Sequence, residues 1–385
     1  MIRAQRFVLA PMPRNVAWVM VAAGALAAAL GLSGDPQRTW PDLLLNGFYT
    51  IALALAGMVF ISLQYLAGAA WSANIRRIPE AMMSALPIAA VLMLSVFFGR
   101  EWLYPAHHLA AHASPSKALY LGAPFFFGRM ALIVVVWSVF ADRMRRASLR
   151  QDEDPAPIHH VRLVRYSAAF IVVFAISFAL ASFDWLMTLV PHWTSTMFAI
   201  YSFAGLLVGG IAAITLCVVL LLEQGYLAGV VNENHLHDLG KLLFAFSTFW
   251  AYIWFCQYLL IWYGNLPEET TYYVSRTGGN WIALFLLNVV VNWVVPFLVL
   301  MPRSSKRNPA ILKWIAIAIL AGRWLDLYLA VMPEMMAAPS LQAIDVLIFA
   351  GYAGVFFLMA TRALASAPLV PVNNPSFSES LAHRQ

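Results

Sequence analysis

Cysteine and charge are both scarce in this chain of 385 residues. Its two cysteines, Cys217 and Cys256, fall inside long apolar runs, so we expect small buried side chains there and neither a disulfide framework nor a cysteine-ligated cluster. Charged residues make up 11% of the sequence, well below the roughly 25% that is typical of soluble domains. These two shortages argue against a water-soluble fold and against an iron–sulfur cluster bound by this chain.

Histidine is missing from the middle of every apolar run, although the chain has nine histidines. A membrane b-type haem needs axial ligands that project from facing helices, so the sequence predicts neither haem nor another metal bound by this chain. His108 and His112 have the i,i+4 spacing of a helical zinc site. Packing or contact with a partner is the more ordinary role for that segment.

Long apolar runs dominate the rest of the chain, and hydrophobic residues make up 62% of it. A run of about 20 apolar residues can cross the hydrocarbon core as a helix, and lipid requires that a spanning segment satisfy its own backbone hydrogen bonds. The sequence therefore predicts an all-α integral membrane fold with ten spans. The runs are 15–33, 43–70, 81–99, 118–140, 166–190, 196–222, 239–263, 279–301, 311–332 and 341–364.

Lysine and arginine are distributed unequally between the two sets of loops. Eighteen of the 24 basic residues fall on the side that holds both termini, and four fall on the other side. The positive-inside rule places the first side in the cytoplasm, so we expect cytoplasmic N- and C-termini. This topology also explains the net charge of +6 and predicts no nucleic-acid partner.

The domain organisation is simple. Residues 1–364 are predicted to form one polytopic membrane domain, and residues 365–385, rich in Pro, Ser and Asn, a flexible cytoplasmic tail. The first span resembles a signal anchor, and a cleavable signal peptide is the alternative. Residues 141–165 are interpreted as the longest loop, a polar cytoplasmic connector.

Ionisable side chains inside the spans are candidate functional residues, because each is costly to place in lipid. Asp184, Asp326 and Asp345 are predicted near the outer face, with Arg129 and Arg323 deeper. An acid at this depth can accept the proton of a quinol hydroxyl and release it outward. The catalytic candidates are Asp184, His192 and Asp326, and Arg323 and Asp345 are assigned to a proton pathway.

A structural interpretation of the same residues stays open. Arg323 and Asp326 have i,i+3 spacing, which allows them to pair on one helix face. Buried ion pairs of this kind can orient helices without taking part in chemistry.

A second polar group stands at the cytoplasmic start of the seventh span. It consists of His235, His237, Asp238 and Lys241, which we assign to proton uptake. Helix capping by Asp238 is the alternative. Deeper polar residues could extend the route or serve as interhelical hydrogen bonds; they are Ser247, Thr248, Gln257, Asn288 and Asn292.

Aromatic residues crowd the same span, with ten between Phe244 and Tyr263. Trp250 and Trp254 share one helix face, and with Arg129 they are the candidate quinol-binding residues. Dense helix packing explains the rings equally well.

Two long segments resemble one protein family. They are FDWLMTLVPHWTSTMFAIYSFAGLLVGGIAAITL (183–216) and HLHDLGKLLFAFSTFWAYIWFCQYLLIWYGNLPEET (235–270). Both are similar to the NrfD-like, polysulfide-reductase-like membrane subunits of bacterial alternative complex III, a quinol:cytochrome c oxidoreductase. The resemblance implies two four-helix bundles with two peripheral helices, and menaquinol or ubiquinol as a possible ligand. It also implies a sister NrfD-like subunit, an iron–sulfur protein and a multi-haem cytochrome c as partners. The functional positions that it implies are Asp184, His192, His235, His237, Asp238, Lys241 and Glu268.

Four functions are therefore compatible with the sequence. The chain could be an electron-transfer subunit that binds quinol, a proton conduit coupled to such a complex, or a structural anchor. A secondary transporter is the fourth, since Pro87, Pro124 and Pro296 are predicted to interrupt spans.

Overall fold

The computed structural model describes residues 6–104, 119–190, 193–371 and 373–383 and is all-helical. Within these residues ten helical segments are long and apolar enough to cross a membrane, so the chain is a multi-pass membrane protein with ten candidate spans. They are Pro11–Gly34 (α1), Pro36–Leu66 (α2), Arg77–Leu103 (α3, α4 and α5), Ala123–Glu153 (α8), Pro157–Leu189 (α9 and η3), Met197–Glu223 (α10), Glu233–Gly264 (α11), Trp281–Leu300 (α13, η4 and α14), Pro309–Glu334 (α16 and η5) and Ala343–Ala365 (α17).

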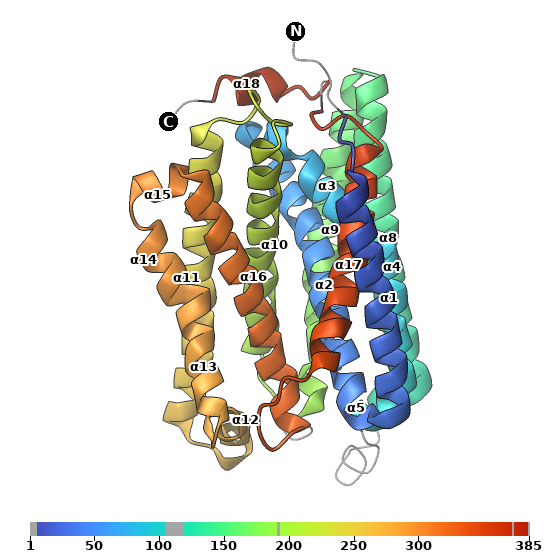
Figure 1. Cartoon of the computed structure of the whole chain (residues 1–385), viewed down its shortest axis with the longest axis vertical. Helices are drawn as coiled ribbons and strands as arrows, with labels where there is room; N and C mark the ends of the chain where they lie inside the picture. The colour runs from blue at the N-terminus through green and yellow to red at the C-terminus, as the bar shows by residue number, and fades with distance from the viewer. Residues whose placement is uncertain (1–5, 105–118, 191–192, 372, 384–385) are drawn as a thin grey trace.

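Both described ends of the chain lie at one end of the helix bundle, here called the terminal end (Figure 1). The helices α5 (Arg100–Leu103) and α12 (Pro267–Thr277) lie at the opposite end, the distal end. This arrangement agrees with the predicted placement of both termini on one side.

Helix starts follow local sequence signals. Proline occupies one of the first two positions of α1, α2, α8, α9, α12 and α16, where its missing N–H costs nothing. The start of α11 is capped by Asn232, whose side chain accepts from the backbone N–H groups of Asn234 and His235. The helix therefore begins at Glu233, and the alternative that Asp238 caps it is wrong.

The connector predicted at 141–165 is mostly helical. Helix α8 has 31 residues and is about 46 Å long at its usual rise, which exceeds the ~30 Å hydrocarbon core. Its charged last turns, with an Arg146–Asp142 pair at 2.8 Å, continue the helix beyond the apolar part. Only residues 154–156 separate α8 from α9.

Prolines interrupt two spans, and a third predicted interruption is absent. Pro87 lies at the start of α4 (Leu86–Ser95), where the third span changes from α3 (Arg77–Met83). Pro296 follows a π-helical turn, η4 (Val290–Val294), between α13 (Trp281–Val289) and α14 (Val295–Leu300). Pro124 lies in the first turn of α8 and interrupts nothing, because a proline there breaks no helical hydrogen bond.

Apart from α1 and α17, the spanning helices pack in two groups. Helix α2 contacts α3, α4 and α9, and α8 packs against both α4 and α9. Helix α10 contacts α11 and α16, while α13 and α14 lie against α16 and α11. Contacts of α10 with α2 and α9 join the two groups.

Helices α1 and α17 form a close pair at the edge of the molecule (Figure 1). A Cβ built on Gly24 would lie 2.5 Å from the Cα of Gly351, and one on Gly354 would lie 2.8 Å from the carbonyl oxygen of Ala17. Small residues let the two backbones approach, which is a usual basis for helix association in lipid.

The C-terminal segment lies across the terminal end (Figure 1). Leu369 and Val370 are buried, and the short helix α18 (Phe377–Leu381) contacts η1 (Ala70–Ile75). The segment assigned to a flexible tail thus has a packed position in this structure.

Candidate functional site

The most elaborate polar cluster inside the helix bundle surrounds the carboxylate of Asp326 on α16, which is 2% exposed. Arg323 Nη2 donates to Asp326 Oδ2 at 2.6 Å, which confirms the pairing predicted from the i,i+3 spacing. Asn288 Nδ2 donates to Asp326 Oδ1 at 2.6 Å, and the hydroxyl of Tyr201 donates to the same oxygen. Three donors thus replace water around a buried carboxylate. The name Asp326 cluster is used below for Asp326, Arg323, Asn288, Tyr201 and Asn292.

The Arg323 side chain occupies a groove on α10. A Cβ built on Gly205 would overlap the guanidinium, and a Cβ on Gly209 would lie 3.3 Å from Arg323 Cγ. The guanidinium carbon lies 5.2 Å from the centroid of the Trp250 ring, within cation–π range. The Gly-x-x-x-Gly spacing of residues 205 and 209 is the sequence signal that could have predicted this groove.

Asn292 reaches the cluster through the π turn η4. The turn precedes Pro296, which has no N–H to donate, and a widened turn accommodates the missing hydrogen bond. Asn292 Nδ2 donates to Asn288 Oδ1 at 2.7 Å. On the facing helix, a Cβ at Gly322 would lie 2.8 Å from the Asn292 side chain, so glycine makes room for the amide. Such π turns are frequent at functional sites.

Two small cavities border Asp326, and each has a volume of about 20 Å³. One lies between α2, α10 and α16, beside Tyr49 and Arg323. The other, called the inner cavity, lies beneath α12 and is bordered by Trp254, Gln257 and Arg276. A cavity needs about 10–15 Å³ to hold one water. Each is therefore the size of a single water and far too small for a quinone ring.

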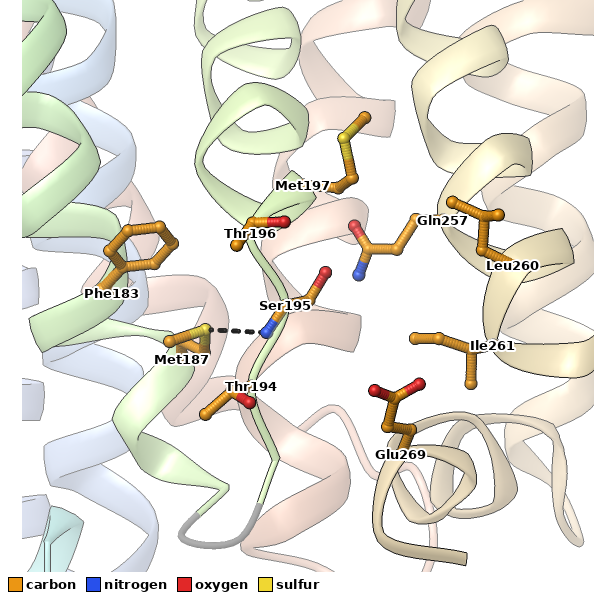
Figure 2. A pocket seen from close by; sticks show the side chains of 10 residues that line it. All are labelled: Phe183, Met187, Thr194, Ser195, Thr196, Met197, Gln257, Leu260, Ile261 and Glu269. Carbon is orange, nitrogen blue, oxygen red and sulfur yellow. Dashed lines mark hydrogen bonds between the residues drawn. The ribbon is translucent and has the colours of Figure 1, made fainter. Parts of the chain in front are cut away.

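A larger cavity of about 500 Å³ opens at the distal end between α11 and the connection from α9 to α10 (Figure 2). It is called the distal cavity. Its volume lies within the roughly 300–1,000 Å³ typical of small-molecule sites. Its lining residues are Phe183, Met187, Thr194, Ser195, Thr196, Met197, Gln257, Leu260, Ile261 and Glu269.

The candidate quinol-binding residues lie elsewhere. Neither the distal cavity nor a neighbouring cavity of about 480 Å³ is lined by Arg129, Trp250 or Trp254. Trp254 borders the water-sized inner cavity, and Trp250 packs against it at 6.2 Å between ring centroids. Glu268 is exposed at the start of α12, and the acid that lines the distal cavity is its neighbour Glu269.

Helix α12 covers the inner cavity and is held by Arg276. This side chain is 2% exposed, donates to the carbonyl oxygens of Leu329 and Ala330 at 2.8 and 2.9 Å, and pairs with Glu334 at 2.9 Å. Its guanidinium carbon lies 3.4 Å from the Tyr272 ring centroid, and burial raises the pKa of the Tyr272 phenol. Sequence reasoning assigned no role to Arg276, because its partners lie some 55 residues away along the chain.

Asp184 on α9 lies in a separate cluster with Arg129 and Tyr120. Arg129 Nε donates to Asp184 Oδ2 at 2.7 Å, and the Tyr120 hydroxyl donates to Oδ1 at 2.9 Å. Burial, followed by the charge of Asp184, raises the pKa of Tyr120. Because α8 begins at Ala123, Arg129 lies nearer the distal end than a span from 118 would place it. His192, the third catalytic candidate, lies outside the described residues.

The two aspartate clusters share a pattern that was not recognised in the sequence. Asp184 and Asp326 each precede a proline by seven residues, Pro191 and Pro333. Each span ends in a short 3₁₀ turn, η3 (Met187–Leu189) or η5 (Met332–Glu334). Each carboxylate also accepts from a tyrosine hydroxyl and from a side chain on another helix. That side chain is Arg129 on α8 for Asp184 and Asn288 on α13 for Asp326.

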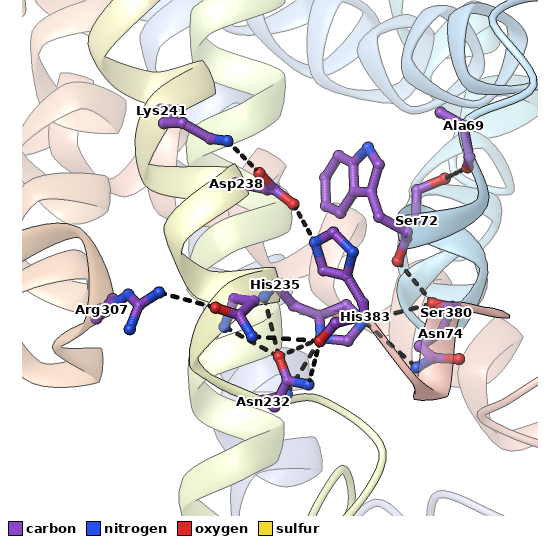
Figure 3. Close-up of polar contacts among 12 residues, drawn as sticks. Ala69, Ser72, Asn74, Asn232, His235, Asp238, Lys241, Arg307, Ser380 and His383 are labelled. Atoms are coloured by element: carbon purple, nitrogen blue, oxygen red, sulfur yellow. Dashed lines mark hydrogen bonds and ion pairs between the residues drawn. The ribbon is translucent and has the colours of Figure 1, made fainter. Parts of the chain in front are cut away.

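The residues at the start of α11 form a third cluster, shown in Figure 3. Asp238 pairs with Lys241 at 2.6 Å and with His383 Nε2 at 2.7 Å. His235 is fully buried, and its Nε2 lies 3.4 Å from both Asn74 Nδ2 and Ser380 Oγ. Through Ser380 and His383, the C-terminal segment thus covers residues that were predicted to open to the cytoplasm.

The deeper polar residues that could extend a proton route from this cluster do not form one continuous chain of contacts among the described residues. The hydroxyls of Ser247 and Thr248 donate to the carbonyl oxygen of Phe244 in their own helix, at 3.1 and 2.9 Å. Asn288 and Asn292, in contrast, join the Asp326 cluster. His237 is half-buried on α11, and Lys241, one turn further along the helix, pairs with Asp238.

Asp345 belongs to a fourth cluster at the distal end. Its carboxylate accepts from Arg38 Nε at 3.0 Å and from the backbone N–H of Gln342 at 2.7 Å, so it also caps α17. Asp42 nearby is fully buried, and neither of its carboxylate oxygens has a hydrogen-bond partner among the described residues. The predicted span from residue 43 leaves Asp42 outside it, whereas α2 begins at Pro36 and carries Asp42 into the bundle.

Comparison with known proteins does not extend these observations, because no model of a known protein family matches the chain and no curated protein matches it significantly. Within the described residues, no group of three or more His, Cys, Asp or Glu side chains is arranged to hold a metal ion.

Proposed function

We propose that this protein is an integral membrane subunit of a respiratory quinol:cytochrome c oxidoreductase of the bacterial inner membrane. Its part in that complex is to conduct protons through the group formed by α10, α11, α13, α14 and α16. Asp326 is the carboxylate that accepts and releases the proton. The alternative of a purely structural anchor assigns no use to the water-sized cavities beside that carboxylate.

The observation that carries the proposal is the environment of Asp326. A buried carboxylate is held by a cation, an amide and a phenol, and it borders two cavities of about 20 Å³. Single waters in such cavities can deliver a proton to the carboxylate and carry it away. Ion pairs that only orient helices have no need of adjoining water-sized space.

The contacts between helices support the two-bundle architecture expected for such a subunit. The contacts of α2, α3, α4, α8 and α9, and those of α10, α11, α13, α14 and α16, are what two four-helix bundles would make. The close pair α1 and α17 corresponds to the two peripheral helices. On this proposal the terminal end faces the cytoplasm and the distal end faces outward.

Partners and substrate follow from the resemblance of residues 183–216 and 235–270. The proposed partners are a sister NrfD-like subunit, an iron–sulfur protein and a multi-haem cytochrome c. We assign quinol oxidation to the sister subunit, because Arg129, Trp250 and Trp254 border neither large cavity described above. The Asp184 cluster and the cluster at the start of α11 remain candidates for the ends of proton routes.

The test replaces Asp326 by asparagine in the intact complex, reconstituted in liposomes. Asp326→Asn can still accept from Tyr201 and Asn288 but cannot bind and release a proton. We expect outward proton release per electron to fall to the level supplied by the partners' own chemistry. The matched control is Asp142→Asn, at an exposed i,i+4 pair on α8.

Two outcomes would contradict the proposal. One is an unchanged proton-to-electron ratio in Asp326→Asn with the complex fully assembled. The other is isolation of the chain without any quinol-oxidising partner when it is purified from its native membrane.

A further inference from the structure

Among the residues that the structure describes, only Gln257 lines both the distal cavity and the inner cavity. On one side of its side chain lies the cavity of about 500 Å³, and on the other lies the cavity of about 20 Å³ that Asp326 borders. Gln257 therefore forms the boundary between Asp326 and the space that opens at the distal end.

The amide oxygen of Gln257 lacks a hydrogen-bond partner. The residue is 3% exposed, and its Oε1 has no hydrogen-bond partner within the described part of the chain. A buried amide oxygen without a partner is costly. Because the amide can both donate and accept, one water in the adjoining cavity would satisfy it and would lie beside Asp326.

The distal cavity is suited to water on the side that faces Gln257. Figure 2 shows the amide of Gln257 directed into the space between α10 and α11, opposite Ser195 and Thr196. Thr194 and the half-buried carboxylate of Glu269 line the same cavity toward the distal surface. Water could thus be held by polar groups from the surface to the amide.

Helix α12 borders the inner cavity through Tyr272, Tyr273 and Arg276 and is held by several contacts. The rings of Trp193 and Tyr272 are stacked with centroids 3.9 Å apart, and Arg276 fixes α12 to the end of α16. Movement of α12 would have to break these contacts. Rotation of the Gln257 side chain is a smaller change that would join the two cavities.

From this geometry we infer that Gln257 is the outer gate of the Asp326 site: it holds the water that links Asp326 to the distal cavity. The inference rests on the proposed function. Gln257 is a positioning residue, because its amide does not exchange protons at neutral pH and acts by orienting water. The proton itself passes from Asp326 to that water and then to the distal cavity.

The test compares Gln257→Leu, Gln257→Ala and Gln257→Glu in the reconstituted complex. Leucine fills the boundary with an apolar group, so outward proton release should fall about tenfold, the effect expected when one hydrogen bond is lost. Alanine leaves room for water in place of the amide and should retain most of the release. Glutamate, which has the same shape and can bind water, should restore it.

The pattern of the three variants separates a gate from a packing residue. A packing residue would make alanine, which leaves a void, at least as harmful as leucine; equal losses in the two variants, with lowered melting temperatures, would overturn the inference. Full release in Gln257→Leu would also overturn it. If Asp326→Asn blocks release while Gln257→Leu does not, only the gate fails, whereas full release in Asp326→Asn removes the proposed function as well.

Discussion

At the scale of residues, the buried carboxylate of Asp326 is stabilised by partners from other helices. Asp326 on α16 takes hydrogen bonds from Tyr201 on α10 and Asn288 on α13, in addition to the ion pair with Arg323. An ion pair in a low-dielectric interior loses most of its value when one member is removed, because the other charge stays buried without compensation. Each member of the cluster therefore depends on the others.

This dependence predicts a rescue. Arg323→Gln should destabilise the protein by about 3–5 kcal/mol, since the carboxylate loses its cation. The double variant Arg323→Gln with Asp326→Asn should recover a large part of that loss, because no uncompensated charge remains. Thermal unfolding of the purified protein in detergent measures both. Strictly additive losses would show that the two side chains are not coupled.

At the scale of helices, small residues decide where large polar side chains can lie. Gly205 and Gly209 on α10 make the groove for Arg323, and Gly322 on α16 makes room for Asn292. Helix contacts built on small residues are common in membranes, where packing replaces the hydrophobic effect as the driving force. The polar cluster and the helix packing are thus one feature of the fold.

The groove can be tested with a matched pair of glycines. Gly205→Ala places a methyl group where the Arg323 guanidinium lies, so we expect a loss of about 1–3 kcal/mol from overpacking together with reduced proton release. Gly128→Ala is the control, because a Cβ there meets nothing within 4 Å. Equal behaviour of the two variants in melting temperature and proton release would argue against the groove.

At the scale of the whole molecule, the two ends of the helix bundle carry different structural features. The terminal end carries α15 (Arg303–Arg307) and the packed C-terminal segment, and the distal end carries α12 and the distal cavity (Figure 1). Near the terminal end, Lys306 donates to the carbonyl oxygens of Leu300 and Met301 at 2.6 and 2.9 Å, and burial lowers the pKa of its ammonium group. A proton route between the ends would need to cross nearly the full length of α11.

The predicted orientation follows from the distribution of basic residues and can be measured directly. In a background with Cys217 and Cys256 replaced by alanine, the exposed positions Ser304 and Thr271 receive single cysteines. A membrane-impermeant thiol reagent should label Thr271→Cys in intact spheroplasts. It should label Ser304→Cys only after permeabilisation. The reverse pattern would place the terminal end outside and refute the orientation.

The C-terminal segment illustrates what local composition leaves open. Its Pro, Ser and Asn content predicted flexibility, yet Ser380 Oγ donates to the carbonyl oxygen of Trp71 at 2.7 Å and His383 pairs with Asp238. These contacts join positions that are more than 140 residues apart in sequence. No local pattern contains information about such partners.

The ten candidate spans and the Arg323–Asp326 pair could be predicted from the sequence, because apolar length and i,i+3 spacing are properties of one continuous segment. The tertiary structure alone decided that Tyr201 reaches Asp326, that Arg276 fixes α12, and that Gln257 stands between two cavities. Lipid offers polar groups no partners, so a buried donor or acceptor that its own helix does not satisfy needs a partner on another helix. Which partner it finds depends on how the helices rotate and approach each other, and that emerges only when they pack.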